Sequence, residues 1–206
     1  YVSPDGDGDG SSIDSPTDLG TALQIVPEGG SIFLCNGDYS LEDAMFIPKS
    51  VSFVGESRDG VELIVSQGFA IANPENPFDE EYTVDSVSFS KMTIDGSAAD
   101  TVIFASANVN ELNITDCLIS SVNNHIVSVG VNVMSEPMQT TGTLNFKRNI
   151  LQATTYSTLW IAGNWNANIN NNLFLIPNED VVMVESTGDV NVDYNYWGSS
   201  NPTLSV

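Results

Sequence analysis

The second half of the chain carries one pattern of hydrophobic and polar positions five times. In each copy the first and third residues are apolar, the second is small and polar, a polar step follows, and large hydrophobes close the segment. The copies are VSFSKMTI (87–94), LNITDCLI (112–119), LNFKRNIL (144–151), ANINNNLF (167–174) and VNVDYNYW (190–197). Their starts lie 25, 32, 23 and 23 residues apart, too far for a hairpin repeat and too close for a βαβ unit. The spacing predicts one coil of a β-solenoid per copy.

Period-two alternation places the first and third residues of each copy inside the solenoid. Stacking coil on coil then aligns three apolar columns. They are Val87, Leu112, Leu144, Ala167 and Val190; Phe89, Ile114, Phe146, Ile169 and Val192; and Ile94, Ile119, Leu151, Phe174 and Trp197. These columns predict the hydrophobic core.

A further strand is predicted between successive copies, in segments 101–106, 125–130, 158–163 and 180–186. The same alternation places inside Ile103, Ala105, Val127, Val129, Leu159, Ile161, Val182 and Val184. The side chains that it predicts to point outward are Phe104, Ile126, Trp160, Val181 and Met183. Outward side chains of this size indicate either a partner surface or a covering loop. The segments 71–83 and 131–142 read as insertions at turns, which a solenoid tolerates and which supply such cover.

The front of the chain predicts one short amphipathic helix over residues 16–26. Ser15 suits the N-cap and Pro16 the first helical position. The predicted buried face consists of Leu19, Ala22, Leu23 and Val26. A helix at this place would cap the open end of the solenoid, where core and unpaired backbone otherwise meet water.

The length of 206 residues suits a single domain with a well-buried core. We expect residues 1–30 to hold a strand, an acidic turn and the capping helix. Residues 31–198 would form the coils, and 199–206 a C-terminal tail leading to a further domain. The chain thus reads as a piece excised from a longer protein.

Charge narrows the range of partners. Five Lys and Arg stand against 27 Asp and Glu, a formal net charge of −22. Such a surface repels nucleic-acid phosphates and anionic membranes, and leaves cations and neutral sugars as easier partners. No apolar run approaches the ~18 residues that span a bilayer, so no membrane insertion is expected.

Several stretches together resemble the right-handed parallel β-helix, or pectin-lyase-like, superfamily. They are the YVSPDG start, PEGGSIFLCNGDY after the helix, FIPKSVSFVGESRDGVELI, and the closing NYWGSSNP. They are most similar to the adhesin-like surface proteins of methanogenic archaea, whose repeats often close with an Asn-aromatic-Trp-Gly motif, here Asn195-Tyr196-Trp197-Gly198. The resemblance implies an all-β, single-stranded right-handed parallel β-helix of roughly seven or eight coils, extracellular and at the cell surface. It fixes no function, because this fold hosts lyases, hydrolases, esterases and non-enzymatic binders.

The opening stretch offers a candidate metal site. Asp5, Asp7 and Asp9 alternate with glycines, and carboxylates on a glycine-rich turn suit Ca²⁺. Counted from Asp5, position twelve is Pro16, where an EF-hand has its bidentate Glu. Two interpretations follow: a bound calcium ion, helped by Asp14, or a plain turn.

Asparagines fall into two axial rows. Asn149, Asn172 and Asn195 share one repeat position, and because stacked coils lie about 4.8 Å apart, their amides are expected to form a structural ladder. The outward second position holds a separate polar row: Ser88, Asn113, Asn145, Asn168 and Asn191. These are either solvated side chains or an array that binds sugar hydroxyls. Asn113 also begins an Asn-Ile-Thr glycosylation sequon.

Two further groups of side chains are candidates. Trp160, with Trp165 and Tyr156 near it in sequence, predicts a stacking platform for a sugar ring, the alternative being packing under a loop. Cys35 and Cys117, the only cysteines, are either two thiols or one pair.

The sequence favours a non-enzymatic domain. Lys147 and Arg148, beside Asp116 in the repeat, offer a conceivable lyase site, but a surface of −22 repels an anionic polymer. The single histidine, His125, matches no glycosidase motif of this fold. We therefore expect a monomeric adhesin-like domain without a cofactor that binds carbohydrate or another cell's surface. The alternatives are a carbohydrate-active enzyme, either polysaccharide lyase or glycoside hydrolase, and a passive structural stalk.

Overall fold

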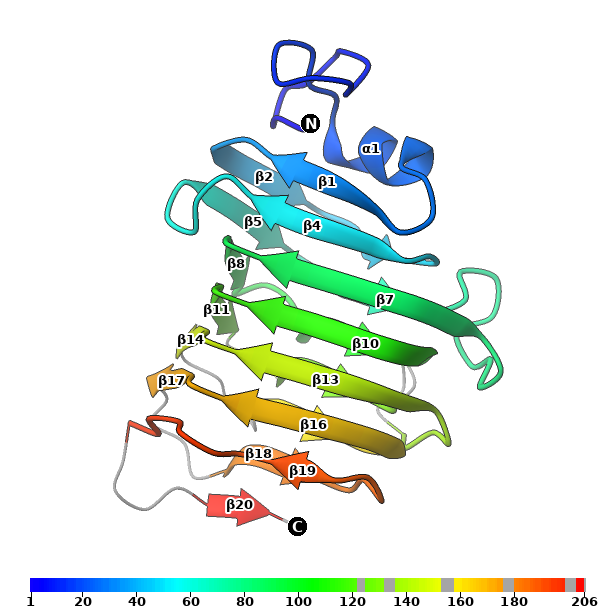
Figure 1. Cartoon of the computed structure of the whole chain (residues 1–206), viewed down its shortest axis with the longest axis vertical. Helices are drawn as coiled ribbons and strands as arrows, with labels where there is room; N and C mark the ends of the chain where they lie inside the picture. The colour runs from blue at the N-terminus through cyan, green and yellow to red at the C-terminus, as the bar shows by residue number, and fades with distance from the viewer. Residues whose placement is uncertain (122–124, 132–135, 153–157, 176–179, 199–202, 206) are drawn as a thin grey trace.

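The chain runs through three parallel β-sheets in turn (Figure 1). The computed structural model describes residues 1–121, 125–131, 136–152, 158–175, 180–198 and 203–205. Sheet A contains β1 (Gly30–Leu34), β4 (Val51–Gly55), β7 (Thr83–Ser90), β10 (Asn108–Thr115), β13 (Thr141–Lys147), β16 (Asn164–Asn170) and β19 (Val190–Asn191). Sheet B contains β2 (Gly37–Leu41), β5 (Val61–Val65), β8 (Thr93–Gly96), β11 (Leu118–Ser121), β14 (Ile150–Gln152) and β17 (Leu173–Leu175). Sheet C contains β3 (Met45–Phe46), β6 (Phe69–Ile71), β9 (Thr101–Ala105), β12 (His125–Val129), β15 (Leu159–Ile161), β18 (Asp180–Val184) and β20 (Thr203–Ser205).

Six coils each contribute one strand to each sheet, and the last contributes β19 to sheet A, β20 to sheet C and only a single bridge at Tyr196 to sheet B. The coils stack along the long axis of the molecule (Figure 1). Sheets A and C each hold seven strands, which gives seven layers among the described residues. The arrangement is all-β and consistent with a parallel β-solenoid. Part of the predicted C-terminal tail joins it, because β20 pairs with β18 at the end of sheet C.

The predicted core columns are confirmed by the strand register through the first four copies, whereas Val190, Val192 and Trp197 of the last copy are only partly buried against the core. Leu112 pairs with Val87 and Leu144, and Ile114 with Phe89 and Phe146. In sheet B, Ile119 likewise pairs with its predicted neighbours in the column, and these side chains are buried. Aromatic stacking continues the columns at both ends: the Phe53 and Phe89 rings lie 5.0 Å apart, and those of Phe174 and Trp197 4.6 Å apart.

The first four repeated segments each contain two strands joined by a bend, and the fifth contains β19, a bend and a single bridge at Tyr196. The bend falls on the polar step, where one residue per coil adopts a left-handed backbone conformation with φ of 57° or 58°: Lys91, Asp116, Arg148, Asn171 and Tyr194. These five residues, here called the corner row, mark where the chain turns from sheet A to sheet B. A coil therefore has three sides.

The capping helix is shorter than predicted. Helix α1 spans Leu19–Ile25 and its N-cap is Asp18, whose carboxylate accepts from the Thr21 N–H at 2.8 Å. The predicted start at Pro16 with Ser15 as N-cap is wrong, because Thr17 forms a parallel bridge with Val2, in which its N–H donates to the Tyr1 carbonyl and its carbonyl accepts from the Ser3 N–H. The predicted apolar face is buried at Leu19, Ala22 and Leu23, and α1 lies beside β1 at the N-terminal end (Figure 1).

The outer face of sheet C differs from the simple alternation. Ile126 and Val181 were expected to point outward, but both belong to the main buried core. The cause is local irregularity in the strands: the N–H groups of Ile126 and Val127 both donate to the Thr158 carbonyl, so the alternation shifts at this point. Phe104 and Met183 remain only partly exposed.

Candidate functional site

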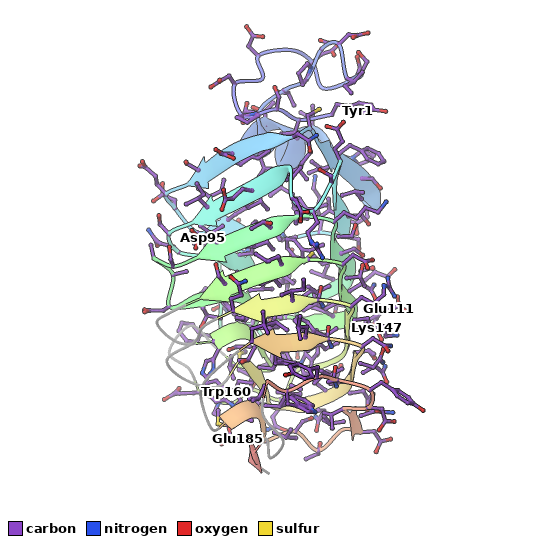
Figure 2. The ribbon with its side chains drawn as sticks, turned by 90° about the vertical axis from the view of Figure 1, so that its left-hand side faces the viewer. Tyr1, Asp95, Glu111, Lys147, Trp160 and Glu185 are labelled. Atoms are coloured by element: carbon purple, nitrogen blue, oxygen red, sulfur yellow. The ribbon has the colours of Figure 1, made fainter. Side chains whose placement is uncertain are left out.

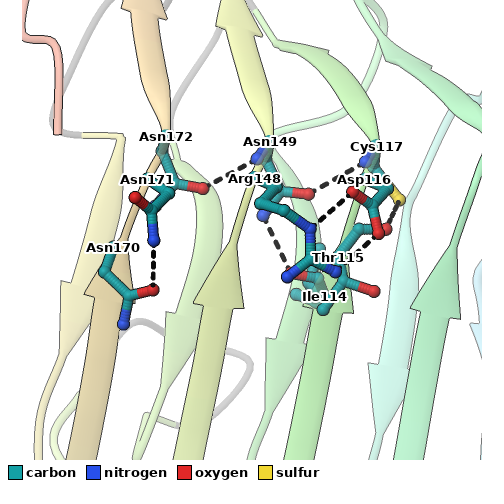
Figure 3. A network of polar contacts seen from close by, with 9 residues as sticks. All are labelled: Ile114, Thr115, Asp116, Cys117, Arg148, Asn149, Asn170, Asn171 and Asn172. Carbon is teal, nitrogen blue, oxygen red and sulfur yellow. Dashed lines mark hydrogen bonds and ion pairs between the residues drawn. The ribbon is translucent and has the colours of Figure 1, made fainter. Parts of the chain in front are cut away.

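A buried amide ladder fixes the bend between sheets A and B in the last coils (Figure 3). Asn172 Oδ1 accepts from the Asn149 N–H at 2.8 Å, and Asn172 Nδ2 donates to the Phe146 carbonyl at 2.9 Å. Asn149 and Asn195 each repeat this pair of bonds to the coil before them. Asn149 and Asn172 are only 1% and 3% exposed. The ladder satisfies backbone groups and offers no surface to a ligand.

Cys117 occupies the equivalent position one coil earlier. Its thiol donates to the Thr115 carbonyl at 3.3 Å, and burial raises its pKa to about 12. Cys35 is also a free thiol. The two cysteines are therefore unpaired, and Cys117 is held in its unreactive protonated form.

A second row of amides lies on the outer face of sheet A, and here it is called the outer row: Asn113, Asn145 and Asn168. Asn145 Nδ2 donates to Asn113 Oδ1 at 3.0 Å, and Asn168 Nδ2 donates to Asn145 Oδ1 at 3.1 Å. All three are half-buried, whereas Asn191 is exposed and accepts from the Asp193 N–H. A carboxamide has two N–H groups, so Asn145 and Asn168, which each donate one along the row, keep a second N–H for a ligand. The hydrogen bonds along the row hold the amide groups in one orientation, which lowers the entropy cost of binding a ligand.

The surface around the outer row is polar. Thr115, Lys147 and Asn170 form the adjacent outward position in register, and Lys147 projects from this side in Figure 2. Hydroxyl, amide and ammonium groups on a sheet face are suited to hydrogen-bond a ligand rich in hydroxyls.

Arg148 and Asp116 pair across the corner row (Figure 3). The guanidinium donates two bonds of 2.7 Å, one to each carboxylate oxygen. These hydrogen bonds lower the pKa of Asp116 and raise that of Arg148. Arg148 is thus held in its charged form, which is unsuited to accept a proton as a lyase base.

The predicted aromatic platform is not assembled as an open surface. Trp165 is fully buried and its Nε1 donates to Thr140 Oγ1 at 3.3 Å. Trp160 is 7% exposed, and its Nε1 donates to Glu185 Oε2 at 3.1 Å (Figure 2). It packs in a small cluster with Val131, at the start of the insertion 131–142. Packing, the alternative interpretation, accounts for Trp160, which lies against Val131, Ala162 and Met183; Tyr156 lies outside the described residues.

In the acidic opening stretch, glycines alternate with the aspartates because the chain passes too close to its own backbone for a side chain at these positions. A Cβ on Gly6 would lie 2.3 Å from the Thr17 carbonyl oxygen, and one on Gly8 2.6 Å from the Ser15 backbone. Asp5, Asp7 and Asp9 are all exposed. Among the residues that the structure describes, no group of three acidic, histidine or cysteine side chains is placed to hold a metal ion.

Two tyrosines that the sequence did not single out are among the most exposed aromatic residues. Tyr194 is 85% exposed and Tyr196 61%. Tyr194 was hidden in the polar step of its repeat and Tyr196 in the closing motif. The available signal was a ring at a corner-row position that otherwise carries charged or amide side chains.

Comparison with known proteins adds no identity: no family model, curated protein or solved structure matches the chain. In the described part of the chain, no helix has the length and apolar character needed to cross a bilayer.

Proposed function

We propose that this chain is a non-enzymatic, adhesin-like domain of a cell surface that binds carbohydrate, built as a single right-handed parallel β-helix of the pectin-lyase-like kind. The observation that carries the proposal is the outer row, in which Asn113, Asn145 and Asn168 present pre-oriented amides on a polar face.

The geometry of the outer row suits an extended chain of sugars. Stacked coils lie about 4.8 Å apart, so the amides repeat at the spacing of the coils. A single amide–hydroxyl hydrogen bond contributes only about 1 kcal/mol net, but a polymer that engages several amides adds these contributions. The net charge of −22 favours neutral glycans over anionic ones.

The remaining parts of the proposal rest on the same surface. The ligand is a glycan, or a surface protein of another cell, and the domain acts as an extracellular monomer without a cofactor and without binding nucleic acid. The alternative to a domain without a cofactor is a calcium ion at Asp5, Asp7 and Asp9, which would pin the capped end of the solenoid rather than take part in binding.

The test combines retention and cleavage. The domain is incubated with cell-wall polysaccharides and with microbial cells, and both bound protein and new chain ends are measured. We expect retention without new unsaturated or reducing ends. Release of such ends would replace the adhesin with a carbohydrate-active enzyme, and absence of both retention and cleavage would leave the passive stalk.

A matched pair of variants locates the surface. The double variant Asn145→Ala, Asn168→Ala removes two amides of the outer row. Gln67→Ala removes an exposed amide between sheets B and C, where it donates to the Glu42 carbonyl. Loss of retention in the double variant alone supports the outer row, and equal retention in all three proteins contradicts it.

A further inference from the structure

Tyr194 and Tyr196 stand at the corner between sheets A and B in the last coil. Tyr194 continues the corner row one coil beyond Asn171, and both have φ of 58°. Tyr196 forms a parallel bridge with Leu173, and its N–H donates to the Asn172 carbonyl at 2.9 Å. The backbone of Tyr196 is thus fixed by the preceding coil.

Folding does not account for the ring of Tyr194. A left-handed backbone conformation is unfavourable for a bulky residue, whereas asparagine, found at this position in the preceding coil, tolerates it. With 85% of its surface exposed, the ring recovers little through packing. A strained, exposed aromatic residue of this kind indicates a role in binding.

An apolar stripe begins beside the two tyrosines. Leu118, Ile150 and Leu173 pair in register along the outward position of sheet B, and Tyr196 extends the line by one coil. All three aliphatic side chains are half-buried, and Leu175 next to them is 45% exposed. The corner thus offers apolar contact on its sheet B side.

Polar groups lie on the other side of the corner from the apolar stripe, toward sheet A. Asn171 Nδ2 donates to Asn170 Oδ1 at 3.1 Å, which holds two neighbouring amides together (Figure 3). One coil earlier, Arg148 and Asp116 neutralise each other through their two-bond ion pair, with side chains 57% and 40% exposed. Planar amides and a neutralised ion pair suit hydroxyl groups better than charged ones.

We propose that this corner binds neutral hexopyranose units of a glycan. The apolar C–H faces of two sugar units would stack on Tyr194 and on Tyr196, while their hydroxyls bond to Asn170, Asn171 and the Arg148–Asp116 pair. The inference rests on the proposed carbohydrate-binding function and adds a second site, centred on the corner and on sheet B; it meets the face of the outer row only at Asn170. A stable protein partner is disfavoured, because it needs about 800 Å² per side, more than a corner of this few residues provides.

The test measures migration in native gels cast with a neutral mannan, a β-glucan or a galactan. The parent is compared with Tyr194→Asn and Tyr196→Ser, with their combination, and with Phe78→Ser. Phe78 is a matched control, since it is 44% exposed and lies in the connection between β6 and β7. Each tyrosine substitution is expected to weaken binding about tenfold, the loss of one aromatic stacking contact. Phe78→Ser should bind as the parent does.

The outcomes separate this inference from the proposed function. Tyr194→Asn should melt no lower than the parent, since asparagine suits the backbone, so weaker binding cannot be attributed to unfolding. Retardation of the parent that is unchanged in the tyrosine double variant overturns the inference alone. An absence of retardation in every gel overturns the proposed function and the inference together. If sedimentation shows a parent dimer that the double variant lacks, the corner binds a second copy and the glycan assignment is wrong.

Discussion

Replacing Asn172 by alanine is expected to destabilise the solenoid strongly. The side chain is 3% exposed and pairs two backbone groups, the Asn149 N–H at 2.8 Å and the Phe146 carbonyl at 2.9 Å. Without the amide both groups stay buried and unpaired, at about 1–3 kcal/mol each. The expected loss is therefore about 2–6 kcal/mol, a large part of the roughly 5–15 kcal/mol typical of a domain.

Urea unfolding measures this loss through the midpoint, provided that the slope of the transition is unchanged. Asn171→Gly is the matched control, since the Asn171 side chain is exposed and donates to Asn170, and its backbone has a conformation that glycine adopts freely. It should stay within about 1 kcal/mol of the parent. Hydrogen exchange should show the Asn149 N–H losing protection in Asn172→Ala only. A loss below about 1 kcal/mol would refute the reasoning, because water or a backbone shift would then replace the amide.

Three further predictions concern other parts of the fold. The pKa of Asp116 is lowered in the folded protein, so its ionised form stabilises the native state. When the free energy of unfolding is measured against pH, this contribution should disappear as the pH falls below about 4. The free energy of unfolding should fall less steeply with pH in Asp116→Asn than in the parent. Gly8→Ala should lower the melting temperature, because the added Cβ would lie 2.6 Å from the Ser15 backbone. Asp7→Asn should leave the melting temperature unchanged, both with calcium and with a chelator. A rise in the melting temperature of the parent on adding calcium would mean that the acidic stretch does bind the metal. Trp160→Ala should cost about 3–5 kcal/mol by urea unfolding, as for a large packed aromatic, and a value near zero would mean that the covering loop does not depend on the ring.

The sequence predicted the parts of the fold that depend on strict alternation. Val87, Phe89 and their equivalents align because each coil repeats the same apolar positions, and the register bears this out. The three-sided coil was less visible, since a residue such as Asp116 in the left-handed conformation looks in sequence like any polar position. Ile126 was misplaced because two N–H groups share one carbonyl, and such an irregularity leaves no mark on hydrophobicity.

The candidate surfaces were predicted less completely than the core. The outer row followed from its period, but Trp165 was not recognised as a core residue because it precedes the repeated segment, although the alternation of Ala167 and Ile169 extends back to it in β16. The helix begins later than predicted because of a contact that the local sequence does not show. Thr17 is drawn into pairing with residues near the N-terminus, and this long-range contact overrides the local preference for a start at Pro16.

The amide ladder is directional. Asn149, Asn172 and Asn195 each bond, through both ends of the amide, to backbone of the preceding coil. During synthesis the preceding coil emerges first, so every new coil arrives with a side chain that fits acceptors and donors already in place. Growth of the solenoid therefore matches the order of translation, starting from the helix-capped end, and no coil in this part of the chain has to wait for residues not yet made.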